Sequence, residues 1–132
     1  TCVDTWCGSD EHKSIDFELI EENFDLNTSF YQSNKTLLKY KMTSSEFFEK
    51  NSKYFDLIFV DGDHSSNKVK VDLINSWNIL KSGGYLILDD YMWWFYKDLK
   101  KNPSTPINNF IKENISNISK LNIWHQVIIK KI

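Results

Sequence analysis

Aspartate residues follow two apolar runs of this 132-residue sequence. Asp61 comes directly after residues 55–60, and Asp89 and Asp90 come directly after residues 85–88. Carboxylates that converge repel one another unless they are protonated or a cation lies between them. Oxygen ligands favour a hard ion such as Mg²⁺. The pattern therefore predicts a magnesium site, and the alternative is that these carboxylates face solvent or cap the next helix.

A histidine, His64, lies three residues after Asp61 in the loop that follows the apolar run. Histidine side chains titrate near neutral pH, which suits a general base. His64 is therefore a candidate to remove a proton from a bound hydroxyl group. The alternative is an ordinary surface histidine.

Two further segments have residue types suited to ligand binding. Asp4 ends the first β-prone run, and an acidic residue at such a strand end binds ribose hydroxyls in Rossmann-like sheets; otherwise it caps a loop. Residues 92–96 (MWWFY) follow Asp90 directly. Their aromatic rings could line an apolar acceptor pocket, belong to the core, or form the contact of a homo-oligomer.

The elements that must position these residues alternate between strands and helices along the chain. Period-two and continuous apolar runs predict strands, and 3.6-residue periodicity with capping signals predicts helices. Strands are expected at residues 2–6, 37–41, 55–60, 85–88, 121–124 and 126–131. Helices are expected near 14–30, 66–80 and 106–118, and a short one through 47–48 after a capping-box sequence at 43–46. This order predicts an α/β, Rossmann-like, doubly wound and mostly parallel sheet that ends in an antiparallel hairpin.

Composition excludes several classes of partner. The formal net charge is −2, and the 16 lysines, which are the only positively charged residues besides histidine, are spread along the sequence, so no basic surface for nucleic acid is expected. No apolar run approaches the length of a membrane span. Two cysteines without a metal-site or disulfide spacing favour reduced thiols, and we expect a cytoplasmic protein.

Residues 55–64 (FDLIFVDGDH) together with residues 83–91 (GGYLILDDY) resemble the fourth and fifth strands of class I S-adenosylmethionine (SAM)-dependent methyltransferases. The likeness is strongest to metal-dependent small-molecule O-methyltransferases, including the macrocin type. Residues 1–4 with Trp6 resemble the family's second strand, and residues 126–130 resemble its last. The resemblance implies the sheet order 3-2-1-4-5-7-6.

That resemblance also implies a first strand and glycine-rich loop ahead of Thr1. We therefore expect residues 1–132 to be a single methyltransferase domain that lacks its N-terminal strand–helix unit. Without that unit, the second and fourth strands would have unpaired facing edges or be forced together. Such a chain is expected to be unstable or to bind SAM weakly.

By resemblance, each candidate residue receives a role. SAM and a divalent metal, Mg²⁺, are the implied cofactors, and the hydroxyl group of a small molecule is the implied acceptor. The metal ligands are Asp61, Asp89 and Asp90, and the catalytic residues are His64, with water as the alternative proton acceptor, and Asp61. The cofactor contacts are Asp4, Trp6, Thr43, Ser44 and Asp61.

Two other functions are compatible with parts of the pattern. Asp61 and Asp63, spaced as Asp-x-Asp after an apolar strand, also resemble the metal–nucleotide motif of nucleotide-sugar glycosyltransferases. A catalytically inactive fragment or partner subunit would retain the second half of the fold and present residues 93–96 for assembly. The expected partners exclude nucleic acid and membranes.

Overall fold

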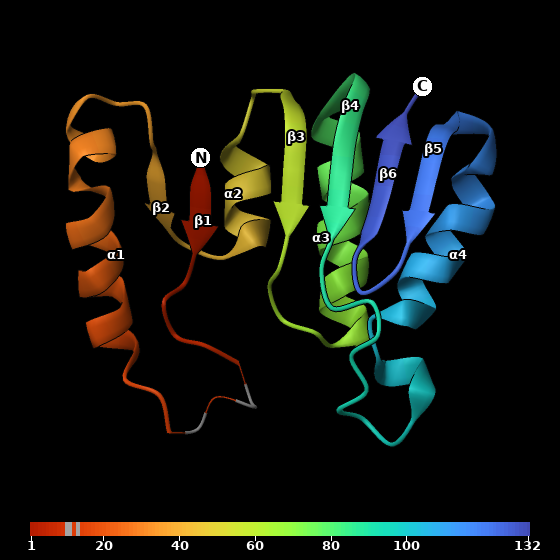
Figure 1. Ribbon diagram of the computed structural model, residues 1–132, viewed down its shortest axis with the longest axis horizontal. Helices are drawn as coiled ribbons and strands as arrows, with labels where there is room; N and C mark the ends of the chain where they lie inside the picture. Colours follow the sequence, from red (N-terminus) through yellow and green to blue (C-terminus); the bar gives the residue numbers. More distant parts are fainter. Residues whose placement is uncertain (10–11, 13) are drawn as a thin grey trace. The chain divides into compact units, whose positions relative to one another are not determined.

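The computed structural model of the chain (Figure 1) describes residues 1–9, 12 and 14–132. It contains two compact units: unit 1 is Thr1–Asn51 and unit 2 is Ser52–Ile132. Both units combine helices with parallel strands, which confirms the α/β class. The single-domain expectation stays a prediction.

Unit 1 contains a two-stranded parallel sheet. Strand β1 (Cys2–Asp4) pairs with β2 (Lys39–Lys41), and helix α1 (Phe17–Ser33) connects them. No residue of α1 is buried. Instead, Lys39 Nζ lies 2.7 Å from carboxylate oxygens of both Glu21 and Asp25, so ion pairs join this strand to the helix.

Helix α2 (Ser44–Lys50) begins with the capping box that the sequence predicts. The Thr43 hydroxyl accepts a hydrogen bond from the Glu46 amide at 3.2 Å, and the Glu46 carboxylate accepts one from the Thr43 amide at 2.9 Å. The Thr43 hydroxyl also donates to the Glu46 carboxylate at 2.8 Å, and the hydrogen bonds from the Thr43 amide and hydroxyl hold the pKa of Glu46 below its ordinary value. Two backbone donors that a helix start leaves unpaired are thereby satisfied.

Unit 2 contains a four-stranded sheet in the order β3-β4-β6-β5. Strand β3 (Phe55–Val60) is parallel to β4 (Leu80–Leu88), and β6 (Val127–Lys131) is antiparallel to both β4 and β5 (Ile118–Ile123). The predicted hairpin is confirmed. The two strand orders, β1-β2 and β3-β4-β6-β5, agree with the order that the resemblance implies for every strand except the first.

One edge of β1 and one edge of β3 have no strand partner in the described part of the chain. Within the described residues, β1 pairs only with β2, and β3 pairs only with β4. Unpaired backbone groups at a strand edge can hydrogen-bond another strand.

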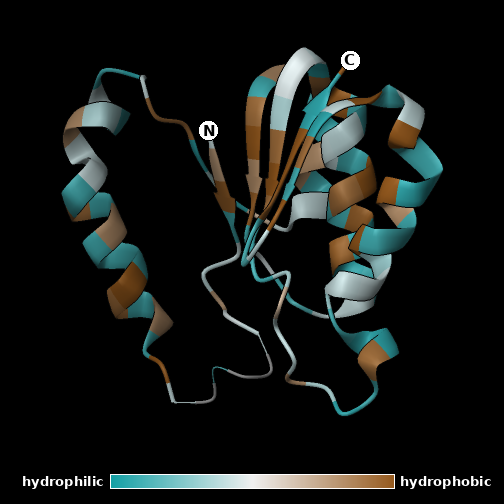
Figure 2. Ribbon diagram, turned by 45° about the vertical axis from the view of Figure 1, so that its right-hand side comes forward, coloured by the Kyte–Doolittle hydropathy of each residue, from teal (hydrophilic) through white to brown (hydrophobic). Residues whose placement is uncertain are grey.

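The core of unit 2 lies between the sheet and two helices, α3 (Ser66–Ile79) and α4 (Ser104–Asn114). Both helices lie on the same face of the sheet, and Figure 2 shows hydrophobic residues along its strands. Leu86, Ile107 and Ile129 are fully buried there. On the opposite face, Leu57 is 56% exposed and Phe59 is 48% exposed. The near-continuous apolar run of β3 predicts burial on both faces, but in this unit only its alternate residues Ile58 and Val60 pack against the core.

The helix boundaries differ slightly from those predicted. Helix α4 begins at Ser104, two residues before the predicted start, because Pro103 already has helical torsion angles (φ −56°, ψ −37°). Ser65 is the N-cap residue of α3, although its side chain makes no capping hydrogen bond. Among the described residues, no helix has the length and hydropathy needed to span a membrane.

Replacing Gly84 with alanine is expected to destabilise unit 2. A Cβ atom there would lie 2.9 Å from the carbonyl oxygens of Asp56 and Lys81, and backbone atoms cannot move aside cheaply. We expect a loss of about 1–3 kcal/mol in the free energy of unfolding, as for other overpacked positions, measured by urea denaturation. Gly62→Ala is the control, because its Cβ would meet only Asp72 Oδ2 at 3.6 Å. Equal losses in both variants would contradict the steric argument.

Candidate active site

Parallel pairing of β3 and β4 places two acidic segments at the same end of the sheet. Val60 and Leu88, the last residues of the two strands, are register partners. The Asp89 amide donates a hydrogen bond to the Val60 carbonyl at 2.9 Å, which continues the pairing beyond the strands. Asp61, Asp89 and Asp90 consequently follow neighbouring strand ends, as predicted.

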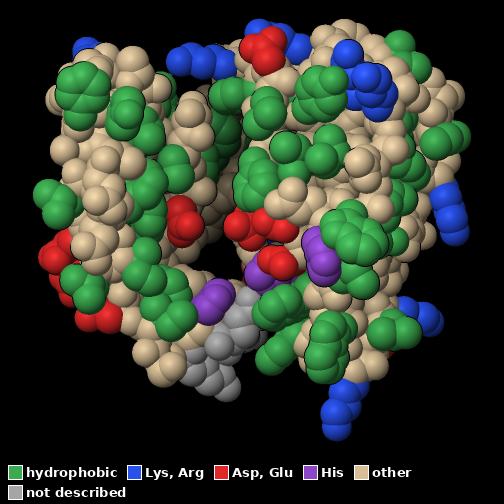
Figure 3. Space-filling view, in the orientation of Figure 1, with side chains coloured by type: hydrophobic (Ala, Val, Ile, Leu, Met, Phe, Trp, Pro, Cys, Tyr) green, Lys and Arg blue, Asp and Glu red, His purple; other side chains and the backbone are tan. Residues whose placement is uncertain are grey.

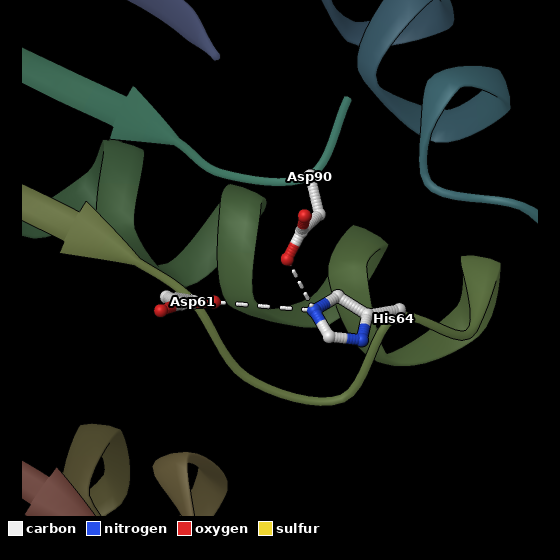
Figure 4. Close-up of side chains that lie close together, drawn as sticks. All are labelled: Asp61, His64 and Asp90. Atoms are coloured by element: carbon white, nitrogen blue, oxygen red, sulfur yellow. Dashed lines mark ion pairs between the residues drawn. The ribbon is translucent and has the colours of Figure 1, made fainter. Parts of the chain in front are cut away.

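The structure brings three of the predicted site residues together, as Figure 4 shows. His64 Nε2 lies 2.8 Å from Asp90 Oδ2 and 3.9 Å from Asp61 Oδ1. Asp61, His64 and Asp90 each offer a ligand atom within 4.8 Å of the others. The His64 side chain is 13% exposed, whereas those of Asp61 and Asp90 are 49% and 37% exposed. Figure 3 shows acidic and histidine side chains side by side on unit 2, bordered by hydrophobic ones.

Asp89 is oriented differently from the other two aspartates. Its Oδ1 accepts a hydrogen bond from the Asp90 amide at 2.9 Å, and its Oδ2 accepts one from Gln126 Nε2 at 3.2 Å. Gln126 precedes β6, which pairs with β4. Both oxygens of Asp89 therefore already accept hydrogen bonds. The contact of Gln126 with Asp89 was not predicted, because no motif in the sequence indicates it.

The electrostatics of the three carboxylates disfavour a further negative charge. Burial raises the pKa of Asp61 above its ordinary value, and the charges of Asp89 and Asp90 raise it further, while His64 opposes both effects. A bound divalent cation would relieve this repulsion. The donor types and their spacing are therefore compatible with a divalent metal ion.

Asp61→Asn is expected to stabilise the metal-free protein at neutral pH. Because folding raises the pKa of Asp61, the unfolded chain ionises at lower pH, so this carboxylate costs stability as pH rises above its ordinary pKa of 3.8. The variant should have a higher melting temperature than the wild type at pH 7 and no such advantage below about pH 4. Thermal unfolding at both pH values tests this. A variant that melts lower at pH 7 would contradict the argument.

The loop after β4 positions an aromatic ring against His64. Asp90 has a left-handed backbone (φ 49°), which is uncommon for residues other than glycine and occurs often at functional sites. The Trp93 amide donates to the Asp90 carbonyl at 2.9 Å. The rings of Trp93 and His64 then lie 4.9 Å apart at 34°. This contact was not predicted, because it depends on the backbone of the loop.

Residues 92–96 are partly exposed and are held at both ends. Tyr91 donates its amide hydrogen to the His125 carbonyl, and the buried Asn102 side chain makes two hydrogen bonds to the backbone of Tyr96. Met92 is 58% exposed and Trp94 is 81% exposed. Trp94 is therefore not a core residue, whereas the acceptor-wall and assembly roles stay predictions.

Predicted cofactor residues of unit 1 lie at the carboxyl end of its sheet. The Met42 amide donates to the Asp4 carbonyl at 3.0 Å, so Thr43 and Ser44 follow beside the end of β1. Asp4 Oδ1 accepts the Trp6 amide at 2.7 Å, which is the loop-capping contact considered above. The Thr43 hydroxyl is engaged in the capping box. Asp61, the fifth predicted cofactor contact, belongs to unit 2.

Trp6 packs against α1. Its ring lies 4.7 Å from that of Phe24, and Lys39 Nζ lies 4.9 Å from the Trp6 ring centre. Its Nε1 is buried without a hydrogen-bond partner among the described residues. The structure therefore gives Trp6 a packing role in unit 1, and its cofactor role stays a prediction.

Three solved structures share the fold of this chain at low sequence identity. The MycE methyltransferase from the mycinamycin biosynthetic pathway, in complex with Mg, SAH and mycinamycin VI, has a TM-score of 0.57 and 16% identity, over 71% of this chain and 31% of that one. A Staphylococcus aureus protein described as a caffeoyl-CoA O-methyltransferase has a TM-score of 0.61 and 18% identity, over 86% and 60%. A Klebsiella pneumoniae protein described as an O-methyltransferase has a TM-score of 0.60 and 12% identity, over 84% and 56%.

The chain spans between 31% and 60% of the length of these three proteins. Comparison with curated protein sequences finds no match. The family profile described as "Methyltransferase domain" matches residues 1–91, a stretch that includes both acidic strand ends. The chain therefore belongs to this methyltransferase domain family.

Proposed function

We propose that this protein is a SAM-dependent O-methyltransferase that uses a divalent metal ion and acts on a hydroxyl group of a small molecule. The observation that carries the proposal is the convergence of Asp61, His64 and Asp90 in a chain of the methyltransferase domain family. Family membership favours methyl transfer over the alternative of a nucleotide-sugar glycosyltransferase. The solved MycE complex, which contains Mg and SAH, supports the same combination of cofactors.

The proposed cofactor is SAM, which supplies the methyl group from its sulfonium centre. Asp4 and Ser44, at the carboxyl ends of β1 and β2, are proposed to contact it, as are Trp6, Thr43 and Asp61. Because Asp4 Oδ1 already accepts the Trp6 amide, ribose hydroxyls would be bound through Oδ2. Carboxylates at this position of a Rossmann-like sheet recognise ribose in this way.

A divalent ion would be held by Asp61 and Asp90. His64 Nε2 lies 3.9 Å from a carboxylate oxygen of Asp61 and 2.8 Å from one of Asp90. When bound, such an ion lowers the pKa of a hydroxyl group that it contacts. The chain's own residues must align the acceptor oxygen with the methyl group and provide a path for its proton. Two adjacent oxygens on the acceptor, as in a vicinal diol or a catechol, would suit a chelating ion.

Binding of S-adenosylhomocysteine to the chain tests the cofactor assignment. Since weak binding is expected, saturation-transfer NMR is the appropriate measurement, because it detects ligands with millimolar dissociation constants. We expect transfer to the adenosine protons in the wild type and its loss in Asp4→Ala. Asp16→Ala is the control, because Asp16 caps α1 in the same unit. Binding that is unchanged in Asp4→Ala would contradict the assigned ribose contact.

Methyl transfer itself separates an enzyme from an inactive fragment or partner subunit. With labelled SAM and Mg²⁺, we expect label in 2,3-dihydroxynaphthalene and none in 2,3-diaminonaphthalene, which has the same ring with nitrogen in place of oxygen. Transfer to the diamine alone would contradict oxygen specificity. Cytoplasmic location, homo-oligomer formation and the absence of nucleic-acid and membrane partners stay predictions.

A further inference from the structure

The donor atoms at the ends of β3 and β4 include a ring nitrogen as well as carboxylate oxygens. His64 Nε2 lies 2.8 Å from one carboxylate oxygen and 3.9 Å from another. Ligand atoms around an octahedral ion at about 2.1 Å lie roughly 3 to 4.2 Å apart, from the bond length alone. The separations of Nε2 from Asp90 and Asp61 are thus close to those of ligands on one ion.

The histidine ring is held with this nitrogen facing the carboxylates. Its side chain is only 13% exposed, and the Trp93 ring lies against it. Trp93 is fixed in turn by its backbone hydrogen bond to Asp90. Within the loop that carries His64, the Ser65 amide donates a hydrogen bond to Asp63 Oδ1 at 2.7 Å.

Asp89, the third ligand implied by the resemblance, is not in the group of converging ligand atoms that the described residues form. One of its oxygens accepts the Asp90 amide and the other accepts Gln126 Nε2. Hydrogen bonds of this kind fix the orientation of a carboxylate at a metal site. The three ligand atoms that converge are those of Asp61, His64 and Asp90.

We propose that His64 Nε2 is the third protein ligand of the divalent ion, with Asp61 and Asp90, and that Asp89 supports the site without binding the ion. This inference rests on the metal dependence proposed above and changes its chemistry. Imidazole nitrogen suits Fe²⁺ or Zn²⁺ better than Mg²⁺. The acceptor proton then passes to water, the alternative to His64 as base.

Pulsed electron paramagnetic resonance of Mn²⁺ added to the full chain, without SAM, tests this ligand set directly. We expect modulation from one directly bound ¹⁴N nucleus, which changes to the ¹⁵N pattern when histidine alone is ¹⁵N-labelled. His64→Gln should remove the signal and weaken Mn²⁺ binding by more than about 10-fold, since even outer-shell partners contribute about 10- to 100-fold. His125→Gln is the matched control, because His125 is not one of the three residues whose ligand atoms converge.

The outcomes separate this inference from the proposed function. Mn²⁺ that binds without nitrogen coupling, and is lost in Asp90→Asn, would overturn the role of His64 and leave the metal dependence standing. No Mn²⁺ binding by the folded wild type would overturn both. Asp89→Asn should keep the nitrogen coupling at saturating Mn²⁺, whereas an Asp89→Asn variant that does not bind Mn²⁺ while His64→Gln still binds it would overturn the outer role of Asp89. Circular dichroism of each variant excludes misfolding as the cause.

Discussion

Asp90→Asn is expected to abolish binding of the divalent ion and to lower methyl transfer by on the order of 10²- to 10³-fold, the usual cost of removing one preorganised electrostatic group. Asp90 Oδ2 lies 2.8 Å from His64 Nε2 and belongs to the group of converging ligand atoms. Asparagine retains the shape of the side chain and tolerates the left-handed backbone at this position (φ 49°). The substitution therefore removes charge with little change in structure.

The measurement is calorimetric titration with Mn²⁺ and with Mg²⁺, followed by turnover with labelled SAM and 2,3-dihydroxynaphthalene. Asp89→Asn is the comparison, since Asp89 is bonded to Gln126 and to the Asp90 amide, and its effect should be smaller. Binding of S-adenosylhomocysteine should be nearly unchanged in Asp90→Asn. If the variant retains both ion binding and turnover, then metal assistance through this residue is wrong.

Proximity of the acidic residues could be predicted because it depends on strand ends alone. Asp61 and Asp89, which Asp90 follows, each come after a largely apolar run, and parallel neighbours end at the same edge of a sheet. The register Val60–Leu88 realises this expectation. The capping box at Thr43 is likewise local in sequence, so it could be predicted from residues 43–46 alone.

Contacts that link distant segments could not be predicted in the same way. Gln126 meets Asp89 across 37 residues, because β6 returns antiparallel beside β4 with one specific register. The contact of Trp93 with His64 depends on the left-handed turn at Asp90. A single substitution or a one-residue change of register would remove either contact without altering the hydrophobic pattern.

The resemblance names Asp89 beside Asp61 and Asp90, whereas the structure brings His64 to these two residues. Contacts with other segments account for this difference. Gln126 and the Asp90 amide engage Asp89, while Trp93 packs against His64 beside Asp61 and Asp90. Motif likeness identifies which residues lie at the strand ends, whereas the surrounding hydrogen bonds orient their side chains. Ligand roles assigned from the motif alone therefore stay predictions.

Leu86→Ala is expected to destabilise unit 2 by about 2–5 kcal/mol, the range for leucine-to-alanine changes in a core. Leu86 lies in the middle of β4, is fully buried, and belongs to the cluster between the sheet and helices α3 and α4. Its register partners are Ile58 on β3 and Ile129 on β6, so the lost side chain would leave a cavity between three strands and the helices.

The opposite face of the same sheet supplies the matched control. Leu57, on the neighbouring strand, is 56% exposed and pairs with Tyr85, next to Leu86. Leu57→Ala should cost less than about 1 kcal/mol, because little apolar surface returns to water. Urea denaturation of both variants measures the difference. A loss at Leu57 as large as that at Leu86 would mean that this face is covered in solution, and that residues such as Leu57 and Phe59 contribute to a second core or to an interface between chains.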